Sequence, residues 1–239
     1  MTEPSDGTPI PVNPVPRAAL LDVDGTLVDS NDAHARAWVE ALAESGRQVD
    51  LLRVRPLIGM GSDKLLPAGI GVEADSPEGE AIVARRTELF LRDHLPHLEP
   101  TRGAQRLLEW LKDDALRVVV ATSANPEELR GLLEIAGATQ LIDEASSSDD
   151  VDRSKPDPDI VHAALTKAGC APGEAIFIGD TPYDIAAGKH AGVPVIALRC
   201  GGWWSDRSFG DAAAIYDHPD DLVNNYLLSP FKRPLVFSK

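Results

Sequence analysis

Residues 20–30 read LLDVDGTLVDS, an apolar run that ends in acidic residues. Asp22 and Asp24 are separated by a single residue, and Gly25 follows directly. Two carboxylates this close repel each other, and burying either one is costly unless a positive charge or hydrogen bonds compensate. The rest of the sequence should therefore supply that compensation.

Similar apolar runs recur along the chain and alternate with stretches of helical spacing. Four of them suit buried strands, namely Ala18–Val23, Leu116–Ala121, Ala175–Ile178 and Val193–Leu198. A weaker strand is expected at Leu141–Asp143. Between these strands, Pro126 suits the first turn of a helix with Asn125 as its cap. The alternation predicts an α/β fold with a Rossmann-like parallel sheet core and helices on both faces.

The interval between the first two expected strands is far longer than the crossover of an ordinary βαβ unit, so it should contain an insertion. Helical patterns at Asp32–Glu44 and Glu78–Asp93 indicate that the insertion is helical. We therefore expect three parts: a disordered, proline-rich tail at 1–16, an α/β core at 17–30 and 99–239, and an inserted α-helical cap domain at 31–98.

The composition argues against polyanionic partners. The chain of 239 residues contains 23 Lys and Arg against 38 Asp and Glu, a formal net charge of -15. This charge disfavours attachment to nucleic acid or to an anionic membrane. No apolar segment approaches the roughly 20 residues of a spanning helix, and no secretory signal is evident. We expect a cytoplasmic protein without nucleic-acid or membrane partners, with reduced thiols at Cys170 and Cys200; its oligomeric state is left open.

Polar residues follow three of the expected strands at the points where those strands end. Besides Asp22 and Asp24, these residues are Thr122, Ser123, Asp180 and Asp184. Open parallel sheets bind ligands outside the carboxyl ends of their strands, and Lys155, in the loop RSKPDPD, could reach the same edge. A divalent cation such as Mg²⁺ would offset the repulsion among the carboxylates, with Lys155 as a second positive charge. The cation and the lysine would then attract an anion such as phosphate.

Four segments carry a resemblance to a known family. They are DVDGT at Asp22–Thr26, VVVATS ending at Thr122–Ser123, the lysine of SKPDP at Lys155, and GDTPYD at Gly179–Asp184. In order and spacing, over roughly residues 17 to 200, the sequence resembles the haloacid dehalogenase-like phosphohydrolase superfamily. Within it, the sequence is most similar to the branch of phosphoglycolate phosphatases and β-phosphoglucomutases, which have a helical cap.

The resemblance implies a division of labour among these residues. Asp22 would attack phosphorus and form an aspartyl-phosphate, and Asp24 would protonate the leaving oxygen and later activate water. Lys155 would neutralise charge on Asp22 and the phosphate. The metal, Mg²⁺, would be held by Asp22, the Asp24 carbonyl and Asp180, with Asp184 as a support or additional ligand. The phosphate and substrate would contact Thr122, Ser123, Gly25 and His34.

His34 has two interpretations. It falls one helical turn before Trp38, which suits a packed, hydrogen-bonded histidine at the domain junction. The stretch DSNDAHARAW also resembles the corresponding part of β-phosphoglucomutases, where a histidine lies near the active site. Taken singly, each carboxylate has a simpler explanation too: Asp22 and Asp24 as turn residues, Asp180 as a helix cap and Asp184 as a solvated acid.

The sequence thus predicts a Mg²⁺-dependent phosphatase, a phosphoric monoester hydrolase that acts on a small phosphorylated metabolite of the phosphoglycolate or sugar phosphate type. One alternative is a sugar-phosphate mutase. In mutases that this sequence resembles, the cap segment after the first helix carries an arginine for the second phosphate. When the sequences are aligned by Gly59, the corresponding position here is Ser62, although Lys64, Arg53 or Arg55 could substitute. The other alternative is a non-catalytic phosphate-binding protein on the same fold.

Overall fold

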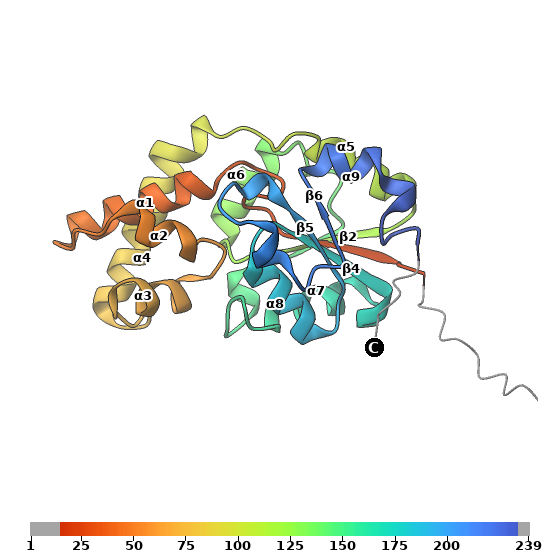
Figure 1. Ribbon diagram of the computed structural model, residues 1–239. Coiled ribbons are helices and arrows are strands. Elements are labelled where there is room, and N and C mark those ends of the chain that lie inside the picture. The colour runs from red at the N-terminus through yellow and green to blue at the C-terminus, as the bar shows by residue number, and fades with distance from the viewer. Residues whose placement is uncertain (1–14, 234–239) are drawn as a thin grey trace, which may run out of the picture.

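A computed structural model describes residues 15–233, whose core is a parallel sheet of six strands (Figure 1). The strands are β1 Ala18–Leu21, β2 Arg117–Ala121, β3 Glu144–Ser146, β4 Ala175–Gly179, β5 Val195–Leu198 and β6 Ala214–Tyr216. Their order across the sheet is β3-β2-β1-β4-β5-β6. The chain therefore builds outward from β1 on one side and then returns to build the other side from β4. Ligands bind at such a reversal, here at the carboxyl ends of β1 and β4.

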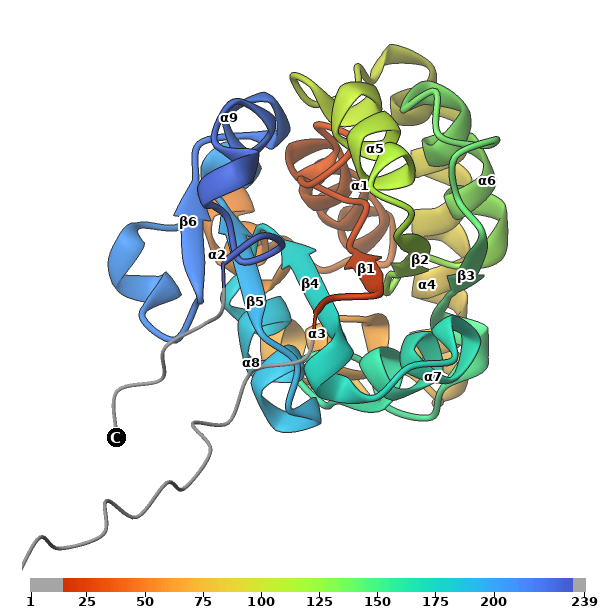
Figure 2. The ribbon, with the colours of Figure 1, turned by 90° about the vertical axis from the view of Figure 1, so that its right-hand side faces the viewer.

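Helices cover both faces of the sheet, which confirms the predicted α/β class (Figure 2). One face carries α5 Ala104–Asp113, α6 Pro126–Ile135 and α9 Pro219–Asn224, and the other carries α7 Asp159–Ala168 and α8 Pro182–Ala191. Successive residues of β1 point to opposite faces. Ala19 and Leu21 pack in the first layer, and Ala18 and Leu20 pack in the second. Because β1 is buried on both sides, its sequence is a continuous apolar run.

The prediction of a strand at Leu141–Asp143 is wrong by three residues. The amides of Leu141 and Ile142 both bond to the carbonyl oxygen of Ala138, at 2.8 and 3.2 Å, so a turn occupies them. Pairing with β2 starts when the amide of Asp143 reaches the carbonyl of Val118 at 2.9 Å, and β3 follows directly. Strand β6 was not predicted, because three residues are too few to show a periodic pattern.

Residues 31–98 form a helical insertion between β1 and α5, on the left of Figure 1. Its helices are α1 Asn31–Glu44, α2 Leu51–Val54, α3 Ser62–Ile70 and α4 Pro77–Leu89, followed by a π-helical turn at Phe90–His94. The helix expected at Glu78–Asp93 thus ends as an α-helix four residues early. The insertion has its own apolar cluster, which includes Trp38, Leu42, Leu66, Ile82 and Leu89.

Two connections that lie side by side join the insertion to the core. The amide of Asp29 bonds to the carbonyl of Glu99 at 3.1 Å, and the amide of Thr101 bonds to the carbonyl of Leu27 at 2.9 Å. An insertion with its own core and a paired exit and entry can move as a unit. The division into core and cap domain stays a prediction, and the predicted tail at 1–16 lies outside the described residues except for its last two.

Two further expectations concern the protein as a whole. Cys170 and Cys200 are both free thiols, as expected. Across residues 15–233, no helix combines the length and apolar character needed to cross a membrane. The cytoplasmic location stays a prediction.

The packing under α5 generates a stability prediction. Leu107 is fully buried beneath the sheet, whereas Leu227 is 72% exposed. We expect Leu107→Ala to lower the free energy of unfolding by about 2–5 kcal/mol, because the truncation leaves a cavity in a close-packed layer. The matched substitution Leu227→Ala should change it by less than about 0.5 kcal/mol. Urea denaturation followed by circular dichroism measures the free energy of unfolding of both variants. Equal decreases in the two variants would contradict the assignment of Leu107 to the buried layer under α5.

Candidate active site

The site begins at the carboxyl end of β1, where the chain must leave the sheet. The amide of Asp22 bonds to the carbonyl of Ile178 at 2.9 Å, so β4 fixes its backbone. Gly25 then turns the chain with a φ of +74°, a conformation that favours glycine. A Cβ atom at Gly25 would also overlap the carboxylate of Asp180. Glycine therefore permits both the sharp turn and the close approach of β4's acidic residue.

Lys155 lies buried between two carboxylates. Its Nζ donates to Oδ1 of Asp22 at 2.5 Å and to Oδ1 of Asp184 at 2.7 Å, and the residue is 1% exposed. Burial alone lowers the pKa of a lysine, but the charges of Asp184 and Asp22 and their hydrogen bonds outweigh it and raise the pKa of Lys155. Lys155 is therefore a permanent cation in direct contact with Asp22.

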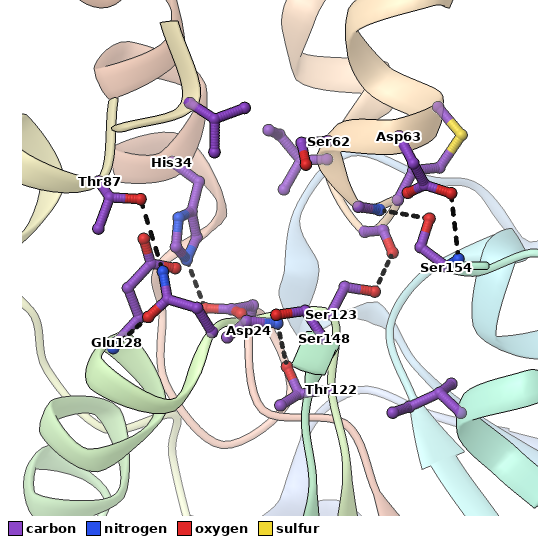
Figure 3. Close-up of a pocket in the computed structure, with 18 of the residues that line it drawn as sticks. Asp24, His34, Ser62, Asp63, Thr87, Thr122, Ser123, Glu128, Ser148 and Ser154 are labelled. Carbon is purple, nitrogen blue, oxygen red and sulfur yellow. Dashed lines mark hydrogen bonds and ion pairs between the residues drawn. The ribbon is translucent and has the colours of Figure 1, made fainter. Parts of the chain in front are cut away.

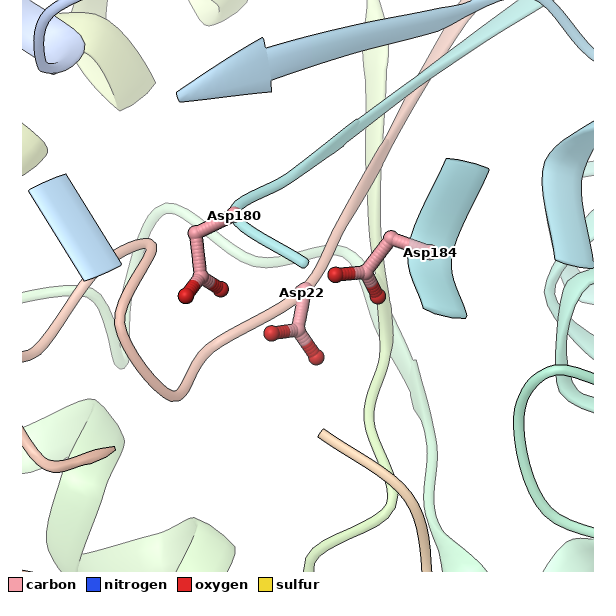
Figure 4. Close-up of side chains that lie close together, drawn as sticks. All are labelled: Asp22, Asp180 and Asp184. Atoms are coloured by element: carbon pink, nitrogen blue, oxygen red, sulfur yellow. The ribbon is translucent and has the colours of Figure 1, made fainter. Parts of the chain in front are cut away.

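The carboxylates of Asp22, Asp180 and Asp184 converge on one small volume (Figure 4). One oxygen atom from each lies within 4.8 Å of the others, and all three side chains are buried. Burial raises the pKa of Asp22 well above its usual range, against the attraction of Lys155 and with the help of the neighbouring carboxylates. Burial, and next the charge of Asp184, raises the pKa of Asp180 to about 7.

These residues fit a divalent metal ion. Three ionised carboxylates beside one ammonium leave two negative charges uncompensated, and carboxylate oxygens are the ligands that hard divalent ions prefer. Asp180 is aimed by hydrogen bonds from Asn31 Nδ2 at 2.7 Å and Thr26 Oγ1 at 3.1 Å. A Cβ atom at Gly201 would overlap Asp180, so the surrounding backbone is shaped closely to this carboxylate.

Asp184 is not the solvated acid that its sequence position suggests. Thr181, not Asp180, is the N-cap of α8, and Asp184 is fully buried, so the interpretations as cap and solvated acid are wrong. Oδ2 of Asp184 accepts hydrogen bonds from the amide and the hydroxyl of Thr181, at 3.0 and 2.6 Å, while Oδ1 accepts from Lys155. Asp184 therefore holds Lys155 in place, and it also remains one of the three carboxylates that could hold a metal ion.

Asp24 belongs to a second, separate network (Figure 3). Its Oδ1 accepts from Ser30 Oγ at 2.6 Å and contacts His34 Nε2 at 2.5 Å. The other ring nitrogen of His34, Nδ1, contacts a guanidinium nitrogen of Arg86. Because arginine can only donate, Nδ1 must accept, and the ring proton therefore lies on Nε2 and is donated to Asp24. His34 also stacks on Phe90 with ring centroids 3.9 Å apart, so it is both packed and in contact with the site.

This network keeps Asp24 ionised. Burial by itself would raise the pKa of the carboxyl group, but the attraction and hydrogen bond of His34, the hydrogen bond from Ser30 and the charge of Arg86 together hold the pKa of Asp24 below its ordinary value. Asp22 and Asp24 are thus neighbours in sequence with opposite electrostatic surroundings. Such a separation lets two carboxylates take different roles in one reaction.

Asp22 and the Asp24 network line a cavity of about 240 Å³ between the core and the insertion. Figure 3 shows the part of it around Asp24 and His34. Its core side includes Asp22, Asp24, Thr122 and Ser123. Oγ1 of Thr122 accepts from the amide of Ala124 at 3.1 Å, which leaves its own proton available to a ligand. The insertion contributes residues from α1, α4, the loop before α3 and the first turn of α3, among them His34, Ile58, Met60, Ser62 and Val83.

The cavity also contains charged residues that were not predicted. Arg86 of α4 lines it and forms an ion pair with Glu128 of α6, which is 1% exposed. Their positions could be anticipated only in part: Arg86 falls in a predicted helix that has several charged residues, and Asn125 predicts the start of α6. Neither pattern indicates which charged side chains meet between the core and the insertion.

The three cations proposed for a second phosphate are engaged elsewhere. Lys64 pairs with Asp157 at 2.8 Å, Arg55 pairs with Asp32 at 2.5 Å, and Arg53 donates to the carbonyl of Gly69 at 3.4 Å. None of them is among the described residues that line the cavity, whereas Ser62 is. The structure therefore gives no support for a substitute arginine at that position.

The chain is similar to known hydrolases and phosphatases. The family model described as haloacid dehalogenase-like hydrolase matches residues 19–198. A phosphoglycolate phosphatase of Rhodospirillum rubrum is 32% identical, over 78% of this chain and 81% of the relative. An N-acetylmuramic acid 6-phosphate phosphatase of Pseudomonas aeruginosa is 30% identical, over 87% of this chain and 93% of the relative. The crystal structure of a hydrolase from Pseudomonas syringae superposes with a TM-score of 0.82 at 27% identity, covering 88% of this chain and 97% of that one.

The acidic cluster generates a prediction about metal and pH. With the pKa of Asp180 raised from 3.8 to about 7, the metal-free folded state keeps a proton that the unfolded chain releases. The stability that this proton contributes is full below about pH 4 and is lost as the pH rises through about 7. A divalent cation binds the deprotonated form, so added MgCl₂ should raise the melting temperature more at about pH 8 than at about pH 5.5.

Differential scanning fluorimetry with MgCl₂ or with EDTA measures this difference at each pH. The variant Asp180→Asn should lose most of the magnesium-induced shift at both pH values. A shift that is the same at both pH values, or that survives in Asp180→Asn, would contradict the assigned metal position.

Proposed function

Because this chain belongs to the haloacid dehalogenase-like hydrolase family, we propose that it is a phosphoric monoester hydrolase that uses Mg²⁺ and forms an aspartyl-phosphate on Asp22. The observation that carries the proposal is the position of Asp22. It is a buried carboxylate at a sheet edge, in contact with Lys155 and beside two further carboxylates, and it lines a cavity of suitable size for a small metabolite.

In the first half of the reaction, an oxygen of Asp22 attacks phosphorus and the bond from phosphorus to the ester oxygen breaks. Lys155 orients the attacking carboxylate through its contact with Oδ1 and offsets its repulsion with the incoming phosphate. The hydroxyl proton of Thr122 is free to be donated to a phosphoryl oxygen, and the amide of Ser123 lies at the same strand end. These groups stabilise the charge that spreads over the phosphoryl oxygens in the transition state.

Asp24 transfers the proton in both halves of the proposed reaction. The carboxylate is ionised in the free enzyme, and the approach of a phosphate dianion raises its pKa through like-charge repulsion, so a proton is taken up with substrate. Asp24 then gives this proton to the leaving oxygen. In the second half, the same carboxylate removes a proton from water, which attacks phosphorus and releases Asp22. His34 holds Asp24 in place through Nε2.

Mg²⁺ would be held by the Asp22 carboxylate, the Asp24 carbonyl and Asp180. When bound, it would neutralise charge on the phosphoryl group and on its own ligands. Asp184 would keep Lys155 in place behind them.

The helical insertion at 31–98 would act as the cap of this enzyme. Its residues form the side of the cavity that faces the leaving group, so they would select the substrate and exclude water while the aspartyl-phosphate exists. The paired connections at Asp29 and Thr101 provide the place where it could open.

The substitution Asp22→Asn tests the mechanism. The amide preserves the shape of the side chain but removes the nucleophile, so Mg²⁺-dependent release of phosphate should fall about 10³-fold or more. Release of inorganic phosphate from p-nitrophenyl phosphate and sugar phosphates, with Mg²⁺ and with EDTA, measures the loss. The matched control is Asp29→Asn, an exposed residue of the same loop. Its activity should remain near the wild-type value, and equal activity of the two variants would exclude Asp22 as the nucleophile.

A further inference from the structure

The wall of the cavity carries more negative than positive charge. Beyond Asp22 and Asp24, three carboxylate residues line its wall: Asp63, Glu128 and Asp152. Arg86 is the single arginine or lysine among the lining residues that the structure describes. Whether an anionic leaving group can bind therefore depends on whether the charge of Arg86 is available.

Two of the three guanidinium nitrogens of Arg86 contact protein partners, whereas its buried Nε has no hydrogen-bond partner among the described residues. One guanidinium nitrogen contacts Glu128 Oε1, and another contacts His34 Nδ1. Its side chain is 12% exposed and that of Glu128 is 2% exposed, so this is an ion pair largely withdrawn from water. The guanidinium also lies over the rings of Trp38 and Phe90, 5.3 and 5.2 Å from their centroids. Breaking the pair to serve a substrate would leave Glu128 buried and uncompensated, which is unfavourable.

The N-terminal cap of α6 fixes the backbone position of Glu128. Asn125 caps α6 and accepts from the amides of Glu127 and Glu128 at 3.0 and 2.9 Å, which confirms the predicted cap. Glu128 thus sits in the first turn of α6, where the partial positive charge of the helix terminus also favours a carboxylate. The rigid core presents Glu128 to the cavity, and the insertion supplies Arg86 to neutralise it.

The other lining residues suit a neutral, hydroxylated group. Asp63 accepts from the amide of Ser154 at 3.2 Å, and Asp152 is exposed at the wall. Between the carboxylates lie apolar surfaces and hydroxyl groups, including Trp38, Met60, Val83, Ser62, Thr87 and Ser148. Carboxylates accept hydrogen bonds from hydroxyl groups but repel anions, and apolar walls pack against the carbon face of a sugar or polyol.

We infer that this enzyme selects monophosphates of neutral sugars or polyols, and that the Glu128–Arg86 ion pair is the specificity determinant that rejects leaving groups with a carboxylate or a second phosphate. The inference rests on the proposed phosphatase activity and names the substrate class of the same site. It also separates this chain from the phosphoglycolate specificity that the name of one relative states.

A substrate pair of matched size tests the substrate class. Glycerol 3-phosphate and 3-phosphoglycerate have the same carbon skeleton, and only the second bears a carboxylate on its leaving group. With wild-type protein and saturating Mg²⁺, kcat/KM for phosphate release should be at least about 10-fold higher for glycerol 3-phosphate. Hexose 6-phosphates should likewise exceed hexose bisphosphates. Equal or faster turnover of 3-phosphoglycerate would overturn the inference while leaving the phosphatase intact, whereas no Mg²⁺-dependent turnover of any ester would remove both.

The variant Glu128→Gln tests the assigned determinant. Without its carboxylate partner, Arg86 becomes available to an anion, so the ratio of kcat/KM for 3-phosphoglycerate to that for glycerol 3-phosphate should rise about 10-fold. Any effect of the substitution on Asp24 through His34 acts on both substrates and cancels in the ratio. Glu127→Gln, an exposed neighbour in the same helical turn, is the matched control and should leave the ratio unchanged.

A second variant covers the case in which Glu128→Gln does not fold. Asp152→Asn removes an exposed lining carboxylate and should raise the same ratio by a smaller factor, about 3-fold. A folded Glu128→Gln protein with the wild-type ratio, or ratios unchanged in Asp152→Asn when the first variant is insoluble, would overturn the assignment of charge as the basis of selection.

Discussion

The buried ammonium of Lys155 is the interaction on which the rest of the site depends. Placed between Asp22 and Asp184, it allows a sheet edge to hold carboxylates that would otherwise repel each other or remain protonated. The single positive charge of Lys155 does not neutralise the carboxylates fully, because Asp180 adds a third carboxylate to the same volume. The remaining negative charge fits a divalent cation, and the proposed Mg²⁺ would in turn attract phosphate.

A second chain of charges joins the core to the insertion. It runs from Glu128 through Arg86 and His34 to Asp24, and so links the wall that faces the leaving group to the carboxylate proposed to move the proton. Two of its four members, Arg86 and His34, come from the insertion, so the insertion helps to hold the pKa of Asp24 below its ordinary value. In the proposed function, Lys155 serves the chemistry at phosphorus and Glu128 the choice of ester.

Much of the architecture could be predicted because patterns in a few consecutive residues indicate it. A buried parallel strand needs a continuous apolar run, and a strand followed by Asp22 and Asp24 with Gly25 needs a sharp turn, so both features are visible in a few consecutive residues. The helical insertion was visible as an interval too long for one crossover. The strand β3 was misplaced because a turn at Ala138 occupied the amides that the apolar pattern suggested would pair.

The sequence alone therefore established the α/β class, the position of the insertion and the candidates Asp22, Asp24, Lys155 and Asp180, since strand ends meet at one edge of any parallel sheet. The fold in three dimensions settled what each side chain touches. The burial of Asp184 behind Lys155, the opposite surroundings of Asp22 and Asp24, and the meeting of Arg86 with Glu128 all depend on segments that are distant in sequence and meet only in the folded protein. No local pattern encodes these contacts, because packing across the whole structure determines them.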